Sequence, residues 1–374
     1  GAEEHSVVLE SIAEVREAWK PVETAAVAMM SGGSDKEAAA KTIAAENLNL
    51  LGTAKILASD ISGRYSNPNE LTQAAAMALR IAARQRTLGH QITKEVCGIL
   101  TASQASGSED GLGQSVDMYS VSLNALRDGM ADAGVNPPPN DAIKKELAAV
   151  SATWQQSKNV LDAIRGGMMP TEENVEAMAE VSTALMGDMS NVVTLYMLAT
   201  PGQERVYRLP LEAYARKQLS KWLTNEDLIE AVRAQSRDHT GLSQAQIDQL
   251  DLDWRAQRKA ESKPMIARLL SQPVSAWLRD QQAQTANFVT EVFAMDNHGL
   301  NVALSVETSD YWQGDEAKWQ ATYGNGSGDI HISEVEFDES TGSYQSQVSM
   351  PITDPSTGEM IGAITFGINV QSLL

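Results

Sequence analysis

The chain has 374 residues, of which 43% are hydrophobic, and its formal net charge is −20 at pH 7. This length allows about two or three domains, and the hydrophobic content is typical of a folded protein rather than a disordered one. Both halves of the sequence are acidic, so the global potential repels nucleic acids and anionic membrane surfaces. We therefore expect no nucleic-acid partner.

Residues 6–199 show helical periodicity interrupted by short turn sequences rich in Gly, Pro, Ser and Asn. Capping patterns begin two of the helical segments, at Ser34 with Glu37 and at Thr171 with Glu172 and Glu173. The sequence predicts helices over 6–31, 35–63, 69–105, 112–134, 139–166 and 171–199.

The first helix pair resembles the last at a constant offset. A shift of 135 residues places Trp19 on Trp154 and Glu37 on Glu172, and it also aligns glycines in the two segments. This agreement favours duplication of one helical hairpin, with chance similarity between amphipathic helices as the alternative. We then expect a partial module in 1–64 and a complete helical bundle in 69–199.

The pattern changes after Pro201-Gly202. We predict one long helix over 211–236, further helices over 243–259, 274–284 and 314–323, and then apolar–polar alternation typical of strands. Turn sequences at 296–299, 338–342 and 354–358 favour hairpins. The fold class is α+β, with an N-terminal antiparallel helical bundle and a five-stranded antiparallel sheet over 288–295, 300–306, 330–337, 343–353 and 360–370.

Arg86 lies in an otherwise apolar part of the helix predicted over 69–105. At about 100° per residue, it falls roughly 140° from the main apolar stripe, on a second face of small and apolar residues. A guanidinium packed there requires an anionic partner, whereas one that extends to water does not. Both alternatives stay open from the sequence.

The segment 83–90 has the sequence ARQRTLGH and is similar to the GRQRMLSQ motif of PilJ-type sensory domains, which are helical periplasmic modules of type IV pilus chemoreceptors and nitrate/nitrite sensors. The resemblance covers roughly 69–199 and, through the repeat, 1–64. It implies that Arg86 binds nitrate or a similar anion at a dimer interface, with Arg84 and His90 as further candidates.

Segments 295–302, 308–319, 337–341 and 361–370 resemble a single Cache (PAS-like) sensor domain, which we expect over 205–374. The family places a ligand pocket between its sheet and the covering helix and loops. The pattern that binds amino acids in other Cache receptors is absent, so we do not expect an amino-acid ligand. The resemblance suggests a pocket wall formed by Asp296, Asp310, Tyr311, Trp312 and Trp319.

Catalytic and metal-binding patterns are missing from the sequence. Its five histidines do not have the spacing of a metal site, and the single cysteine, Cys97, excludes a disulfide framework and a thiolate cluster. We expect no enzymatic activity, no metal and no cofactor.

Together these features predict the periplasmic, ligand-sensing region of a bacterial signal-transduction or chemotaxis-type protein. It would bind small molecules, with a small anion such as nitrate as a further candidate ligand, and it would form a homodimer through the helical bundle. A free soluble periplasmic binding or scaffold protein that signals through a separate partner is the alternative. No apolar run reaches the length of about 18 residues needed for a membrane span, so membrane attachment would use only segments not present here.

Overall fold

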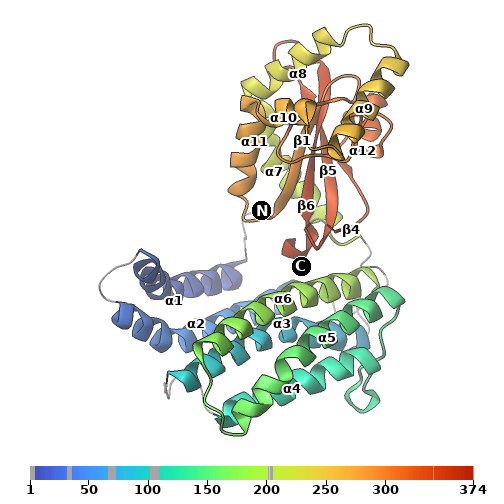
Figure 1. Cartoon of the computed structure of the whole chain (residues 1–374). Coiled ribbons are helices and arrows are strands. Elements are labelled where there is room, and N and C mark those ends of the chain that lie inside the picture. Colours follow the sequence, from blue (N-terminus) through green and yellow to red (C-terminus); the bar gives the residue numbers. More distant parts are fainter. Residues whose placement is uncertain are drawn as a thin grey trace. The chain divides into compact units, whose positions relative to one another are not determined.

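The computed structural model describes residues 5–31, 36–65, 73–101, 109–200, 202, 205–339 and 341–373. The chain divides into two compact units, residues 2–204 and residues 205–374. The first unit is helical, and the second combines helices with an antiparallel sheet (Figure 1). This confirms the predicted α+β fold class.

The first unit contains the six predicted long helices. The turn sequences at 32–35, 66–72 and 102–108, together with the predicted cap at Ser34, lie outside the described residues. The cap at Thr171 is confirmed, because its hydroxyl accepts a hydrogen bond from the Asn174 backbone N–H in a capping box. The helices are α1 (Ser6–Met30), α2 (Lys36–Tyr65), α3 (Gln73–Leu100), α4 (Glu109–Asp128), α5 (Asp141–Arg165) and α6 (Glu172–Leu198).

Helices α3 to α6 form a closed four-helix bundle. Helix α3 packs against α4 and α6, and α5 packs against the same two helices (Figure 1). At the centre, the Trp154 ring lies 4.1 Å from the Tyr119 ring, and both side chains are fully buried. Helix α1 packs along α2. Burial of apolar stripes from neighbouring helices is the main source of stability in this arrangement.

The helix predicted over 112–134 ends earlier than expected, at Asp128. Gly129 follows with φ +84°, and a Cβ atom at this position would lie 2.9 Å from the Pro137 ring. The chain therefore leaves the helix at Gly129 in a conformation that favours glycine. A short bridge between Met130 and Val135 and the one-turn helix η1 (Ala131–Ala133) occupy the rest of the predicted span.

The second unit is built on one antiparallel sheet with the strand order β2-β1-β6-β5-β3, and β4 also pairs with β5. The strands are β1 (Val289–Met295), β2 (Asn301–Leu304), β3 (His331–Ile332), β4 (Glu336–Asp338), β5 (Ser343–Thr353) and β6 (Met360–Asn369). The helices are α7 (Arg208–Lys217), η2 (Leu219–Thr224), α8 (Glu226–Asp238), α9 (Gln244–Arg258), α10 (Pro264–Leu270), α11 (Pro273–Ala283), α12 (Ala317–Trp319), the following turn η3 (Gln320–Gly324) and η4 (Val370–Leu373).

Two predicted elements are divided in the structure. The helix expected over 211–236 is interrupted because Asn225 is extended and caps a new helix, its side chain accepting from the Leu228 N–H. The strand expected over 330–337 becomes β3 and β4. Between them, the Ser333 carbonyl accepts hydrogen bonds from the hydroxyls of Tyr207 and Ser346. Helix α10 was not predicted.

An apolar cluster fixes the segment between β2 and α12 on the sheet. Trp254 from α9 stacks on Tyr311 of this segment, and both pack with Phe293 of β1. Nearby, the β1–β2 turn and the segment approach so closely that a Cβ atom on Gly299 would overlap the backbone of Gly314. This packing positions the segment over one part of the sheet.

Candidate functional site

A cleft of about 620 Å³ lies between the sheet and the segment that connects β2 to α12. Strands β1 and β5 supply one side, the β2–α12 segment supplies another, and α9 contributes Arg258. The cleft therefore lies where the Cache resemblance places a ligand pocket. Its lining residues are Arg258, Glu291, Phe293, Glu307, Thr308, Ser309, Gln313, Glu316, Ala317, Lys318, His331, Ser333, Glu336, Phe337, Asp338, Gln345 and Gln347.

The sheet side of the cleft is polar. Glu291 on β1 accepts a hydrogen bond of 3.1 Å from Gln347 on β5. Burial raises the pKa of the Glu291 carboxyl above its ordinary value, and the Gln347 hydrogen bond opposes this shift. The adjacent Gln345 is buried, and its amide joins Thr290 to Asp338. These side chains form a hydrogen-bonding surface in place of an apolar strand face.

The lining contains two basic side chains, Arg258 and Lys318, and each of them contacts a glutamate. Glu307 accepts from Arg258 at 3.1 Å and also pairs with Lys263. The Lys318 ammonium lies 2.9 Å from a Glu316 oxygen and 5.2 Å from the centre of the Phe293 ring. The cleft thus holds an ammonium group between a carboxylate and an aromatic face.

Histidine contributes no positive charge to the cleft at neutral pH. Burial lowers the pKa of His331 below its ordinary value of 6.5, and the nearby Arg208 lowers this pKa further. His331 is therefore neutral at pH 7, where it can accept or donate a hydrogen bond.

Gln313 has an incomplete set of hydrogen bonds. Its side chain is 1% exposed, and its amide nitrogen donates to the carbonyl and the carboxylate of Asp310 at 3.0 and 2.7 Å. Its Oε1 atom is buried and accepts no hydrogen bond from any residue that the structure describes. A buried acceptor without a donor costs about 1–3 kcal/mol, so a ligand that donates a hydrogen bond here would gain affinity.

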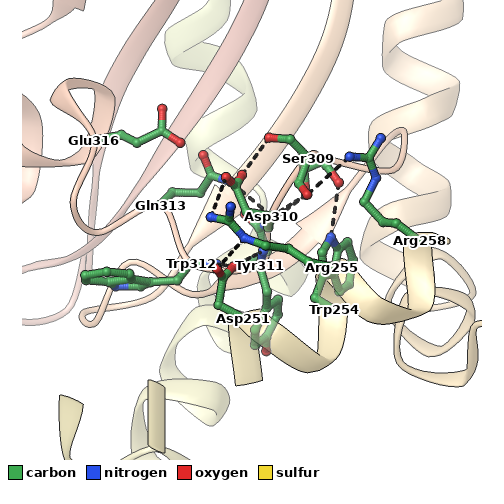
Figure 2. A network of polar contacts seen from close by, with 12 residues as sticks. Asp251, Trp254, Arg255, Arg258, Ser309, Asp310, Tyr311, Trp312, Gln313 and Glu316 are labelled. Carbon is green, nitrogen blue, oxygen red and sulfur yellow. Dashed lines mark hydrogen bonds and ion pairs between the residues drawn. The ribbon is translucent and has the colours of Figure 1, made fainter. Parts of the chain in front are cut away.

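The five residues predicted as pocket wall do not line this cleft. Asp310 binds Arg255 of α9, which also binds Asp251 (Figure 2). Asp251 in turn accepts from the backbone N–H groups of Tyr311 and Trp312 at 2.8 and 3.1 Å. These contacts hold the β2–α12 segment, called the covering segment below, to α9, so the side chains are not free to bind a ligand.

The polar groups of three more of these side chains also form hydrogen bonds within the fold, those of Trp312, Trp319 and Asp296. The indoles of Trp312 and Trp319 donate to the backbone carbonyls of His298 and Asp296, at 2.9 and 3.1 Å. The fully buried Asp296 carboxylate accepts from His239, from Gln235 and from two backbone N–H groups of its own turn. A direct role for these five residues in ligand binding stays a prediction.

The sequence contained a usable signal for the residues that do line the cleft. Glu291 is a single carboxylate in an otherwise largely apolar strand, and Gln345 and Gln347 alternate with residues of the opposite face in β5. Polar residues at alternate positions of a central strand indicate a face covered by something other than an apolar core.

The RQR motif in the bundle is divided by the helix geometry. Gln85 is buried and donates to the Tyr119 carbonyl, whereas Arg84 is exposed. Arg86 is half-buried and makes neither a hydrogen bond nor an ion pair with the residues that the structure describes. His90 is exposed, and its ring nitrogens contact Ser182 at 2.8 Å and the Met186 sulfur at 3.2 Å.

The fold and cleft define a two-unit protein in which a four-helix bundle precedes an antiparallel sheet with a polar cleft. Residues 71–178 match the PilJ family, described as the N-terminal region of type IV pili methyl-accepting chemotaxis transducers. This confirms the PilJ-type resemblance for the helical bundle. A comparison with curated proteins gives no match.

Solved sensory domains show limited similarity. The ligand-binding domain of the P. aeruginosa nitrate receptor McpN is 21% identical with a TM-score of 0.28, over 32% of this chain and 92% of that domain. The sensory domain of the Campylobacter jejuni chemoreceptor Tlp3 with isoleucine bound is 16% identical with a TM-score of 0.22, over 45% of this chain and 64% of that one. The V. cholerae histidine kinase DctB sensor domain is 15% identical with a TM-score of 0.21, over 44% and 58%. At such TM-scores, the similarity carries no conclusion about a ligand.

None of the helices in the described part of the chain has both the length and the apolar character required to cross a membrane.

Proposed function

We propose that this chain is the extracytoplasmic ligand-sensing region of a bacterial chemotaxis-type or other signal-transduction protein, without catalytic activity of its own. The PilJ match over residues 71–178 supports the signalling class. The single observation that carries ligand binding is the cleft of about 620 Å³, whose lining includes a buried acceptor without a donor at Gln313. A volume of this size accommodates a small molecule.

A ligand in the cleft would contact the sheet and the β2–α12 segment together. It would therefore favour the arrangements in which the two are held close to each other, and the population of these arrangements would rise on binding. The segment is also anchored to α9 through Asp251 and Arg255. A movement of the segment on ligand binding would therefore be transmitted to α9 through these contacts.

A thermal-shift screen of the chain against amines, carboxylates, inorganic anions and neutral polar compounds tests the proposal. A ligand at about 100 times its Kd stabilises a folded protein by about 2.7 kcal/mol. For a unit of this size, that corresponds to a rise in Tm of roughly 5–10 °C. A screen in which no class of compound raises Tm would contradict ligand sensing by this chain.

We also propose that Arg86 binds a small anion such as nitrate, with Arg84 and His90 as further candidate residues. In support, the Arg86 guanidinium is half-buried and has no carboxylate partner in the described chain. Arg86→Ala should weaken nitrate binding about tenfold or more, because a charge-assisted hydrogen bond contributes about 1.5–3 kcal/mol. Isothermal titration calorimetry with nitrate and nitrite measures this effect.

Arg80→Ala is the matched control for Arg86→Ala, because Arg80 is exposed on the same helix. This variant should bind nitrate as the unmodified chain does. If the unmodified chain binds neither anion, Arg86 has a structural role and the anion-site proposal fails.

A homodimer is proposed from the exposed face of α1. With the 135-residue offset, Trp19 and Met29 correspond to Trp154 and Ile164 of α5. The α1 residues are 46% and 36% exposed, whereas their α5 counterparts are 2% and 0% exposed because α4 and α6 cover them. We infer that a second copy of the chain covers this face of α1, because exposed apolar surface at bundle positions favours association.

A further inference from the structure

The charges that line the cleft are unequal. Five carboxylates line it against two permanent cations, Arg258 and Lys318, and each of these cations already contacts a glutamate. Neither Glu291 nor Glu336 forms an ion pair with a cation of the described chain. An anionic ligand would therefore meet a negative potential and no unengaged cation.

The hydrogen-bonding groups of the cleft lead to the same conclusion independently of charge. The buried Oε1 atom of Gln313 requires a donor. Glu291 can accept further hydrogen bonds besides the one from Gln347, because a carboxylate has about four acceptor positions. A ligand rich in N–H donors satisfies these groups, whereas a ligand rich in acceptors does not.

The Lys318 side chain shows that the cleft can accommodate an ammonium group. Its nitrogen lies against the Glu316 carboxylate and faces the Phe293 ring, and the side chain is only 12% exposed. Cations are attracted to aromatic faces at such distances. A second aromatic ring in the lining, Phe337, is 44% exposed and accessible to a ligand.

We propose that the cleft binds a small organic cation, a primary amine or diamine, whose ammonium group interacts with Glu291 and donates to Gln313. This inference rests on the proposed function and specifies the ligand class of the same site. It is carried by the carboxylate excess, the buried acceptor and the ammonium already present in the cleft. The pattern that binds amino acids in Cache receptors plays no part in it.

Calorimetric titration of the full chain with three probes of similar length tests the ligand class. The probes are 1,4-diaminobutane, which is cationic, succinate, which is anionic, and 1,4-butanediol, which is neutral. We expect the diamine to bind and the other two to give no heat of binding. The compounds that raise Tm in the broader screen are titrated in the same way.

Variants of the cleft assign the binding to these residues. Glu291→Gln keeps the shape of the side chain and its acceptor for Gln347 but removes the charge, and it should weaken amine binding about tenfold or more. Lys318→Met removes a competing cation and should strengthen amine binding. The matched control is Glu359→Gln, which changes an exposed carboxylate outside the cleft and should have no effect.

The stability of Glu291→Gln separates loss of binding from loss of folding. Because the pKa of Glu291 is raised in the folded state, its ionised form destabilises that state at pH values above the ordinary value of 4.5. The unliganded variant should therefore have a Tm equal to or higher than that of the unmodified chain at neutral pH. The difference should vanish below pH 4.5, where the carboxyl is protonated in both the folded and the unfolded state.

The possible outcomes are distinct. Amine binding that falls in Glu291→Gln and rises in Lys318→Met supports the proposal. If only anionic or neutral compounds bind in the cleft, and this binding is lost in Lys318→Met or unchanged in Glu291→Gln, the proposal of an amine ligand is overturned. The proposal of ligand sensing then still stands. If no compound of any class binds or raises Tm, both the ligand class and the proposed function fail.

Discussion

Replacing Trp154 by alanine is expected to destabilise the helical unit by about 3–5 kcal/mol, the usual loss for a large aromatic side chain in a core. Trp154 is 2% exposed, packs on the Tyr119 ring at 4.1 Å and donates from its indole N–H to the Ser120 hydroxyl at 3.2 Å. The collapse of the neighbouring helices can fill only part of the space. Thermal unfolding followed by far-ultraviolet circular dichroism should show a fall in Tm of roughly 10 °C.

The internal repeat supplies the control for this variant. Trp19→Ala changes the corresponding residue of α1, which is 46% exposed. It should reduce the stability of the unassociated chain by less than about 1 kcal/mol, because little buried surface is lost. It should also weaken dimer formation, measured by light scattering coupled to size-exclusion chromatography. Equal losses of stability in the two variants would argue against the repeat, and an unchanged dimer in Trp19→Ala would argue against the proposed interface.

Replacing Trp254 by alanine should have an effect of similar size on the second unit, about 3–5 kcal/mol. Trp254 is fully buried, stacks on Tyr311 with a ring separation of 5.4 Å and donates to the Thr308 carbonyl at 3.1 Å. The substitution leaves a cavity under the β2–α12 segment, and it removes the indole N–H that donates to the backbone carbonyl of Thr308 in that segment. Because Thr308 lines the cleft, we expect weaker ligand binding as well as a lower Tm.

Leu252→Ala is the matched control for Trp254→Ala, because Leu252 lies on the same helix and is 59% exposed. Its effect on stability should lie within about 0.5 kcal/mol. Thermal unfolding and calorimetric titration of the same two variants measure both consequences. A Trp254→Ala chain with unchanged Tm would show that the apolar cluster does not hold the covering segment in place.

Most of the helices could be predicted from the sequence because their signals are local. The periodicity of the apolar residues and the cap at Thr171 predict helix positions without knowledge of any distant contact. The same local signals failed at Asn225, where a cap inside a continuous helical pattern begins a new helix. They also failed at Ser333, whose carbonyl accepts hydrogen bonds from Ser346 on a neighbouring strand and from Tyr207, which is 126 residues away in the sequence.

The residues of the cleft were harder to predict than the elements that carry them. Aromatic and acidic side chains are common in binding sites, and the resemblance to a sensor family predicted a pocket wall that includes Asp310, Trp312 and Trp319. In the folded chain, Arg255 forms an ion pair with the Asp310 carboxylate, and the two indole N–H groups donate hydrogen bonds to backbone carbonyls. Which polar groups are satisfied depends on neighbours that are distant in the sequence, such as α9 for the 308–313 segment.

The sequence by itself determined the acidic character of the chain, the helical first unit, the antiparallel hairpins of the second and the RQR motif at Arg86. Each of these depends on residue type and spacing over short distances. Only the tertiary structure decided that Glu291, Gln345 and Gln347 face a cleft and that Gln313 keeps a buried acceptor without a donor. The reason is that a binding site consists of the polar groups that remain unsatisfied after folding, and these are known only when all long-range contacts are in place.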